Sequence, residues 1–149
     1  FKNDFKNDFK NDFKNDFNTE EYYLKQVRDI VTTCVKRRLE SDKPRAFLLS
    51  GGVDSSLICS ISSKLLGQKI RTFCCGMKGG TDLKYARQVA EHIGSNHTEV
   101  IFTPEQGLQK IRDVIRFTET WDTTSIRASI GQHIVCEYRQ YANTNPSYQ

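Results

Sequence analysis

The residues best suited to chemistry lie in one short segment, residues 50–56, with the sequence Ser-Gly-Gly-Val-Asp-Ser-Ser. Gly51 and Gly52 allow the backbone to turn tightly and to approach an oxyanion with no Cβ in the way. Several backbone N–H groups can then converge on a phosphate or pyrophosphate, as they do at helix N-termini. The segment also brings three hydroxyl groups that can donate hydrogen bonds, those of Ser50, Ser55 and Ser56.

Asp54 stands in the same segment, where its carboxylate would repel a bare anion. A bound Mg²⁺ between the carboxylate and the phosphates would remove that conflict. The segment is not a Walker loop, because no lysine follows the glycines. A loop that holds the β,γ-phosphates as a leaving group suits attack at the α-phosphate instead. The alternative is an ordinary strand–turn–helix with glycine in the turn and Asp or Ser as the helix cap.

The elements expected to position this loop alternate along the chain. Apolar runs and helical periodicity predict helices and strands in turn, with Gly67 and Gly94 as helix ends and Thr81 and Thr103 as helix caps. This order predicts an α/β fold with a parallel sheet and crossover helices. The loop then lies at the carboxyl end of the first strand, where such sheets bind ligands. We expect helices at residues 19–39, 54–66, 81–93, 103–115 and 126–141, the fourth of them continuous from Thr103 through Ile115. We expect strands at residues 45–49, 70–75 and 97–102.

The chain of 149 residues is expected to hold one domain. Residues 1–17 repeat Phe-Lys-Asn-Asp four times and end in Phe17, which predicts a disordered low-complexity tract. Residues 142–149 have the composition of a loop, so the domain is expected over residues 18–141.

Charge and cysteine content exclude several classes of protein. The net charge is only +4 and no long basic block occurs, which argues against a nucleic-acid partner. No apolar stretch approaches the roughly 18 residues that span a membrane, and no secretory signal is present. The five cysteines include no C-x-x-C pair, which indicates reduced thiols and a cytoplasmic location. The H-x-E pair of His97 and Glu99 is expected to be structural, because two ligands do not make a metal site.

Several segments together resemble the synthetase domain of glutamine-hydrolysing asparagine synthetase, a member of the ATP pyrophosphatase superfamily. The resemblance runs from about residue 18 to residue 138 and is carried by residues 48–56, 72–77, 82–83, 102–107, 111–115, 119–122 and 124–129. It implies a Rossmann-like adenine nucleotide α-hydrolase fold, truncated here after about three strands. It also implies that ATP adenylates the side chain of aspartate, that pyrophosphate leaves, and that ammonia derived from glutamine attacks the aspartyl-AMP.

The resemblance also implies roles for particular residues. Leu48 and Cys75 would contact the adenosine, largely through their backbones, and residues 50–56 would hold the pyrophosphate with Asp54 facing Mg²⁺. Thr124 and Arg127 would be catalytic in the activation step, where a fixed guanidinium and hydroxyl stabilise developing phosphate charge. Without the resemblance, a simple pairing of Arg127 with Asp122 would be the preferred interpretation.

The sequence departs from the family pattern in two places. The glutaminase domain, with its nucleophilic N-terminal cysteine, is replaced by the repeat tract, and the second loop, Ser-Gly-Glu-Gly-Ser-Asp-Glu, is absent. We therefore expect an inactive isolated chain, an open apolar edge on the first strand, and a need for a separate glutaminase or a C-terminal half. The alternatives are a non-catalytic nucleotide-binding remnant or interaction module, and another ligase of the superfamily, such as a β-lactam or argininosuccinate synthetase, which residues 124–129 disfavour.

Overall fold

The computed structural model describes residues 20–144, and for residues 141–144 it describes the backbone alone. The chain divides into two compact units, Phe1–Ser41 and Asp42–Gln149. In the first unit, helix α2 (Glu20–Arg38) begins with acidic residues and ends with Lys36, Arg37 and Arg38, which complement the helix dipole. The predicted first helix is therefore confirmed. Residue 19, where this helix was predicted to begin, and the repeat tract 1–17 lie outside the described residues.

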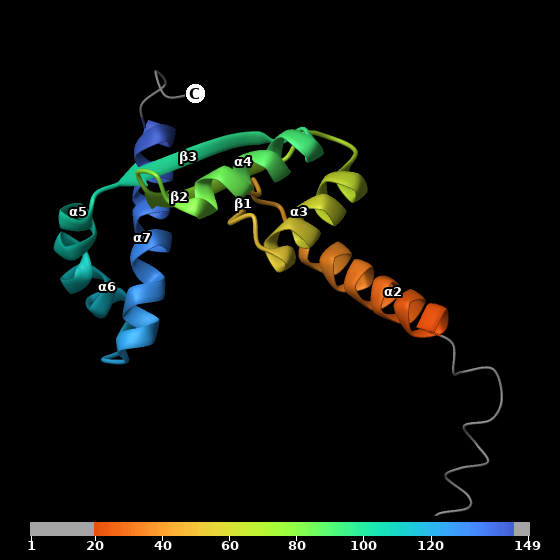
Figure 1. The fold of residues 1–149 in the computed structure, drawn as a ribbon, viewed down its shortest axis with the longest axis horizontal. Coiled ribbons are helices and arrows are strands. Elements are labelled where there is room, and N and C mark those ends of the chain that lie inside the picture. The colour runs from red at the N-terminus through yellow and green to blue at the C-terminus, as the bar shows by residue number, and fades with distance from the viewer. Residues whose placement is uncertain (1–19, 145–149) are drawn as a thin grey trace, which may run out of the picture. The chain divides into compact units, whose positions relative to one another are not determined.

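The second unit is built on a parallel sheet of three strands, β1 (Phe47–Leu48), β2 (Arg71–Met77) and β3 (Asn96–Phe102), in the order β1-β2-β3. Helices α3 (Val53–Leu66) and α4 (Thr81–Ile93) connect the strands. After β3 come α5 (Pro104–Gln109), α6 (Ile111–Thr118) and α7 (Thr123–Thr144) (Figure 1). The predicted α/β class with a parallel sheet and crossover helices is confirmed. Within the described residues, β1 pairs with β2 and lies at one edge of the sheet.

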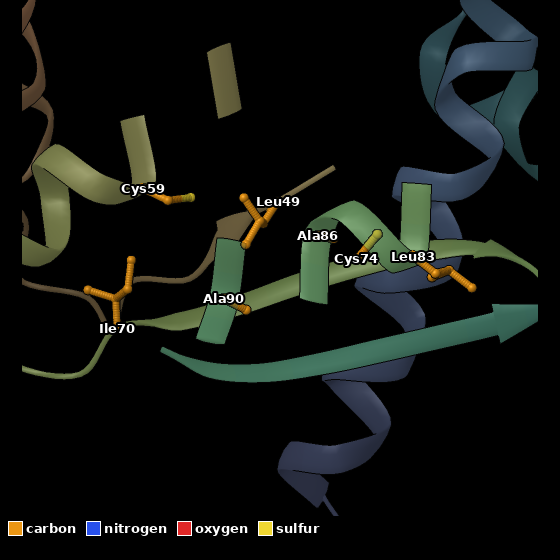
Figure 2. Close-up of a cluster of buried hydrophobic side chains, with 7 residues drawn as sticks. All are labelled: Leu49, Cys59, Ile70, Cys74, Leu83, Ala86 and Ala90. Atoms are coloured by element: carbon orange, nitrogen blue, oxygen red, sulfur yellow. The ribbon is translucent and has the colours of Figure 1, made fainter. Parts of the chain in front are cut away.

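The core lies between one face of the sheet and the helices α3 and α4, and α7 packs on the other face. Because successive side chains of a strand point to opposite faces, Cys74 enters the core while Cys75 faces α7, where it meets Gly131. Figure 2 shows the core side chains, contributed by α3, β2 and α4 together with Leu49 just after β1 and Ile70 just before β2. The buried cluster consists of Leu49, Cys59, Ile70, Cys74, Leu83, Ala86 and Ala90.

Most of the predicted helix ends and caps are confirmed. Gly67 and Gly94 end α3 and α4 in the left-handed conformation, with φ of 60° and 63°. Thr103 and Gln106 form the predicted capping box at the start of α5. The expectation for Thr81 is wrong, because Gly80 is the N-cap and Thr81 is already the first helical residue.

Three boundaries differ from the prediction. The first strand is two residues long in place of five, because only Phe47 and Leu48 enter the register with β2. The single helix expected through Ile115 is two helices that meet at Lys110. The last helix begins at Thr123 and reaches Thr144, so residues 142–144 are helical where a loop was expected, and residues 145–149 lie outside the described part.

The early start of α7 has a local cause in the residues just before Ile126, where the sequence predicted the helix to begin. The carboxylate Oδ2 of Asp122 accepts a hydrogen bond from the backbone N–H of Ser125 at 2.7 Å, as a helix N-cap does. The first backbone bond of the helix follows, from Ile126 N to Asp122 O at 3.0 Å. Across residues 20–144, no helix is long and apolar enough to cross a membrane.

Candidate nucleotide-binding loop

The loop of residues 50–52 connects the carboxyl end of β1 to the N-terminus of α3 (Figure 1). Its serines hold one another in place: Ser50 Oγ lies 3.0 Å from Ser55 Oγ, and Ser50 N donates to Ser55 Oγ at 3.3 Å. The hydroxyls of Ser55 and Ser56 both donate to the carbonyl of Gly52, at 3.1 and 2.7 Å. These hydroxyls are thus engaged within the loop, so the main donors free to meet an anion are backbone N–H groups.

The two glycines of the loop have different structural roles. Gly51 has φ of +81°, and a Cβ on it would lie 2.5 Å from Tyr85 Cβ and 2.6 Å from Ala86 N. Gly51 therefore packs directly on the backbone of α4. Gly52 has φ of −70°, and a Cβ there would meet only Ser50 Oγ, at 3.4 Å. The sequence suggested a similar role for both glycines, and it gave no sign of this close approach to α4.

The N-terminus of α3 presents a set of uncapped amides. Gly52 is its N-cap and contributes no side-chain hydrogen bond. The first intrahelical bond is made by Ser56 N, to Gly52 O at 3.0 Å. The preceding amides of the first turn, those of Val53, Asp54 and Ser55, have no carbonyl four residues back in the helix. Together with the helix dipole they form the kind of site that binds phosphate groups.

Asp54 lies in the first turn of α3 with an exposed side chain. Its carboxylate oxygens are of the type that Mg²⁺ prefers, and Mg²⁺ commonly combines one or two carboxylates with phosphate oxygens of the substrate. Among the described residues, no group of three or more His, Cys, Asp or Glu could hold a metal ion by itself. Asp54 therefore fits a cation that arrives with phosphates, and does not fit a preformed protein cage.

Cys75 borders a gap in the sheet next to the loop. Leu49 N donates to Phe73 O at 2.8 Å, so the backbone of Phe73 faces β1, and by alternation the backbone of Cys75 faces the same side. The register of β1 ends at the pair Leu48 and Phe73, so no β1 residue lies opposite Cys75. Its backbone is thus placed beside the loop, where the sequence expected a nucleotide contact. The register also puts the side chains of Leu48 and Cys75 on the same face of the sheet, and Leu48 is 52% exposed.

The thiol of Cys75 is used in packing. A Cβ on Gly131 of α7 would lie 2.7 Å from Cys75 Sγ. Burial, reinforced by the negative charge of Asp82, raises the pKa of Cys75, and burial raises the pKa of Cys74 to about 11. Both thiols are therefore protonated at neutral pH, which leaves the backbone of Cys75 as its means of contacting a ligand.

Thr124 and Arg127 lie in the first two turns of α7, both exposed. Among the ion pairs of residues 20–144, none joins Arg127 to Asp122. The Asp122 carboxylate instead binds Ser125, and these hydrogen bonds lower the pKa of Asp122. The simple pairing that the sequence left open for Arg127 is not formed.

The path of α7 shows where these two residues lie. Gly131 is against Cys75 of β2, and farther along the helix Ile134 and Tyr138 line a pocket of about 340 Å³ with residues 100–102 of β3. Toward its N-terminus, α7 thus runs from β3 past β2 to the β1 side of the sheet (Figure 1). Residues four and seven positions before Gly131 share its face of the helix. Arg127 and Thr124 are therefore on the β1 side, the side of the loop, although no hydrogen bond joins them to it in the described structure.

A polar network at the opposite end of the strands contains the H-x-E pair. Glu99 accepts two hydrogen bonds from Arg87, at 2.9 and 2.8 Å, and His97 Nδ1 lies 2.9 Å from the buried Thr72 Oγ1. Thr72 Oγ1 is also 2.8 Å from Ser95 Oγ. His97 and Glu99 are thus occupied in structural contacts, as the sequence predicted.

The fold and the loop define a class: an α/β domain with a parallel sheet, in which a Ser-Gly-Gly turn after the first strand leads into an uncapped helix. Comparison with known proteins narrows this class to a family. A sequence model described as asparagine synthase matches residues 26–142. The chain belongs to the asparagine synthase family.

Individual relatives agree with this assignment. The chain is 43% identical over 117 residues to a glutamine-hydrolysing asparagine synthetase of Gallus gallus, and 42% identical over 117 residues to that of Homo sapiens. Each match covers 75% of this chain and 21% of the relative. It is 44% identical over 112 residues to asparagine synthetase 3 of Arabidopsis thaliana, covering 69% of this chain and 19% of the plant protein. The chain thus spans about a fifth of the length of the curated relatives it matches.

Proposed function

We propose that this chain forms the ATP-binding part of an enzyme that makes asparagine from aspartate. The observation that carries the proposal is the uncapped N-terminus of α3, near the backbone of Cys75, which has no strand partner on its β1 side. Family membership supplies the reaction class, since the relatives above are named as glutamine-hydrolysing asparagine synthetases.

The pyrophosphate portion of ATP would bind at the loop. Its negative charge would be stabilised by the amides of Val53, Asp54 and Ser55 in the first turn of α3, beside Gly52, which has no side chain to obstruct the ligand. The exposed carboxylate of Asp54 would hold Mg²⁺ together with phosphate oxygens. A bound Mg²⁺ would neutralise charge on the leaving pyrophosphate.

The adenosine would lie across the gap beyond β1. The backbone N–H and C=O of Cys75 face that gap, and they can pair with the edge of a base. The exposed side chain of Leu48, on the same face, offers an apolar surface for the ring. Contacts made through the backbone of Cys75 depend little on its side chain.

The activation step would take place between the loop and α7. A side-chain oxygen of aspartate attacks the α-phosphorus, the bond to the bridging oxygen breaks, and pyrophosphate leaves. Ammonia, supplied free or by a glutaminase acting on glutamine, then attacks the acyl carbon and AMP leaves. Arg127 and Thr124, on the β1 side of α7, would donate to the phosphate oxygens on which charge develops.

The proposal is tested by calorimetric titration of the full chain with ATP and Mg²⁺. We expect binding that weakens about tenfold or more in Asp54→Ala, the scale of losing one charged contact. Asp113→Ala is the matched control, since Asp113 is also an exposed acidic residue in the first turn of a helix, α6. Equal binding by both variants, or no binding by a folded chain, would refute the proposed site.

A further inference from the structure

Helix α7 meets β2 in a close contact between two small residues, Gly131 and Cys75. Gly131 lies against Cys75 so tightly that an added Cβ would be 2.7 Å from Cys75 Sγ. Real Cβ atoms do not approach sulfur this closely, so any side chain at position 131 would require the thiol or the helix to move. Gly131 is in the interior of a helix, where glycine is disfavoured relative to alanine. Helix propensity therefore does not explain the glycine, whereas the close approach does.

The contact joins the two halves of the proposed site. Cys75 is a residue of β2 whose backbone faces the gap beyond the end of β1. Arg127 and Thr124 precede Gly131 by four and seven residues, on the same face of α7, and so lie about 6 and 10 Å farther along the helix axis. Since a helix is stiff over two turns, the height of Gly131 above the sheet fixes the height of Arg127.

We propose that Gly131 is a positioning residue, which through its contact with Cys75 places Arg127 at the phosphates of the bound nucleotide. This inference rests on the proposed ATP-binding function. Gly131 itself does not contact the ligand. Residues 75 and 131 together set the distance between α7 and the sheet.

A set of variants of the full chain tests this, with calorimetry of ATP and Mg²⁺ as the readout and far-UV circular dichroism as the check of folding. Gly131→Ala is expected to weaken binding about tenfold, the scale of one misplaced charge-assisted hydrogen bond. The same change in an Arg127→Ala background is expected to have less than about a twofold further effect, because the group it misplaces is already gone. Gln132→Ala, at an exposed neighbouring position on α7, is the control that should bind as the unaltered chain does.

Cys75→Ala combined with Gly131→Ala completes the test and also covers the case in which the single variant does not fold. Removal of Sγ makes room for the new Cβ, so the double variant should fold and bind like Cys75→Ala alone. Binding by Gly131→Ala that equals that of the unaltered chain would refute the positioning role and leave the ATP site intact. An equal loss with and without Arg127 would also refute it, and failure of the unaltered chain to bind would refute the ATP site itself.

Discussion

A side chain added at Gly51 and one added at Gly52 would meet different surroundings. At Gly51, φ of +81° forces an L-residue into a strained conformation, which costs about 1–2 kcal/mol. The new Cβ would also lie 2.5 Å from Tyr85 Cβ and 2.6 Å from the backbone of Ala86, a residue of the core cluster. Because backbone atoms of α4 cannot rotate away, the helix must shift, and overpacking of this kind costs about 1–3 kcal/mol more.

We therefore expect Gly51→Ala to lower the free energy of unfolding by about 2–5 kcal/mol. That is a large part of the roughly 5–15 kcal/mol that stabilises a typical domain. Gly52→Ala is the matched control: φ is −70° and the nearest atom to a new Cβ is the movable Ser50 Oγ at 3.4 Å. The poorer capping by alanine and the reduced entropy of the unfolded chain oppose each other there, so the change should stay within about 1 kcal/mol.

Urea unfolding followed by circular dichroism at 222 nm measures the difference. For a slope of about 1–1.5 kcal/mol per molar urea, Gly51→Ala should shift the midpoint downward by about 1.3 M or more, and Gly52→Ala by less than about 1 M. The fluorescence of Trp121 is a poor probe, since this residue is 85% exposed in the folded chain. Equal shifts for the two variants would show that Gly51 does not pack on α4 as described.

Two further predictions concern stability away from the loop. Burial lowers the pKa of His97 below 6.5, so the unfolded chain binds the proton more readily than the folded chain, and the free energy of unfolding should fall as pH drops below 6.5. His97→Gln should therefore reduce the change in the free energy of unfolding between pH 7.5 and 5.5. An unchanged pH dependence in this variant would contradict the prediction. Thr103→Ala should lower the free energy of unfolding, measured in urea, by about 1 kcal/mol because the capping box is lost. Thr81→Ala should leave it nearly unchanged, because Thr81 is not a cap. Equal losses for the two variants would refute the distinction.

The sequence predicts the architecture well because its signals are local and strong. Glycine at positions 67 and 94 ends two helices in the left-handed conformation, and the alternation of apolar runs with helical periods specifies a parallel sheet. The structure of the polar segment before Ile126 is harder to predict, because an aspartate such as Asp122 is equally typical of a turn and of a helix cap. The two-residue β1 is shorter than predicted because the chain leaves β2 after Leu49, which no local pattern reveals.

The site is predictable in part. The loop itself is visible in the sequence as glycines and serines around Asp54, and the resemblance to a family points to residues 124 and 127. Contacts between distant elements are not visible, because Gly51 against Tyr85 and Gly131 against Cys75 depend on how helices pack on the sheet. A glycine inside a predicted helix, such as Gly131, was the available signal for a close approach.

Residues 50–56 and Cys75 are proposed to form one nucleotide site. Amide chemical shifts of the isotopically labelled full chain, followed by NMR while ATP and Mg²⁺ are added, test it most directly. We predict that the largest shifts fall on the amides of residues 52–55 and of Cys75, with smaller ones at Arg127 and little change around His97 and Glu99 at the other end of the strands. Shifts concentrated away from the loop, or none at saturating ATP, would contradict the account.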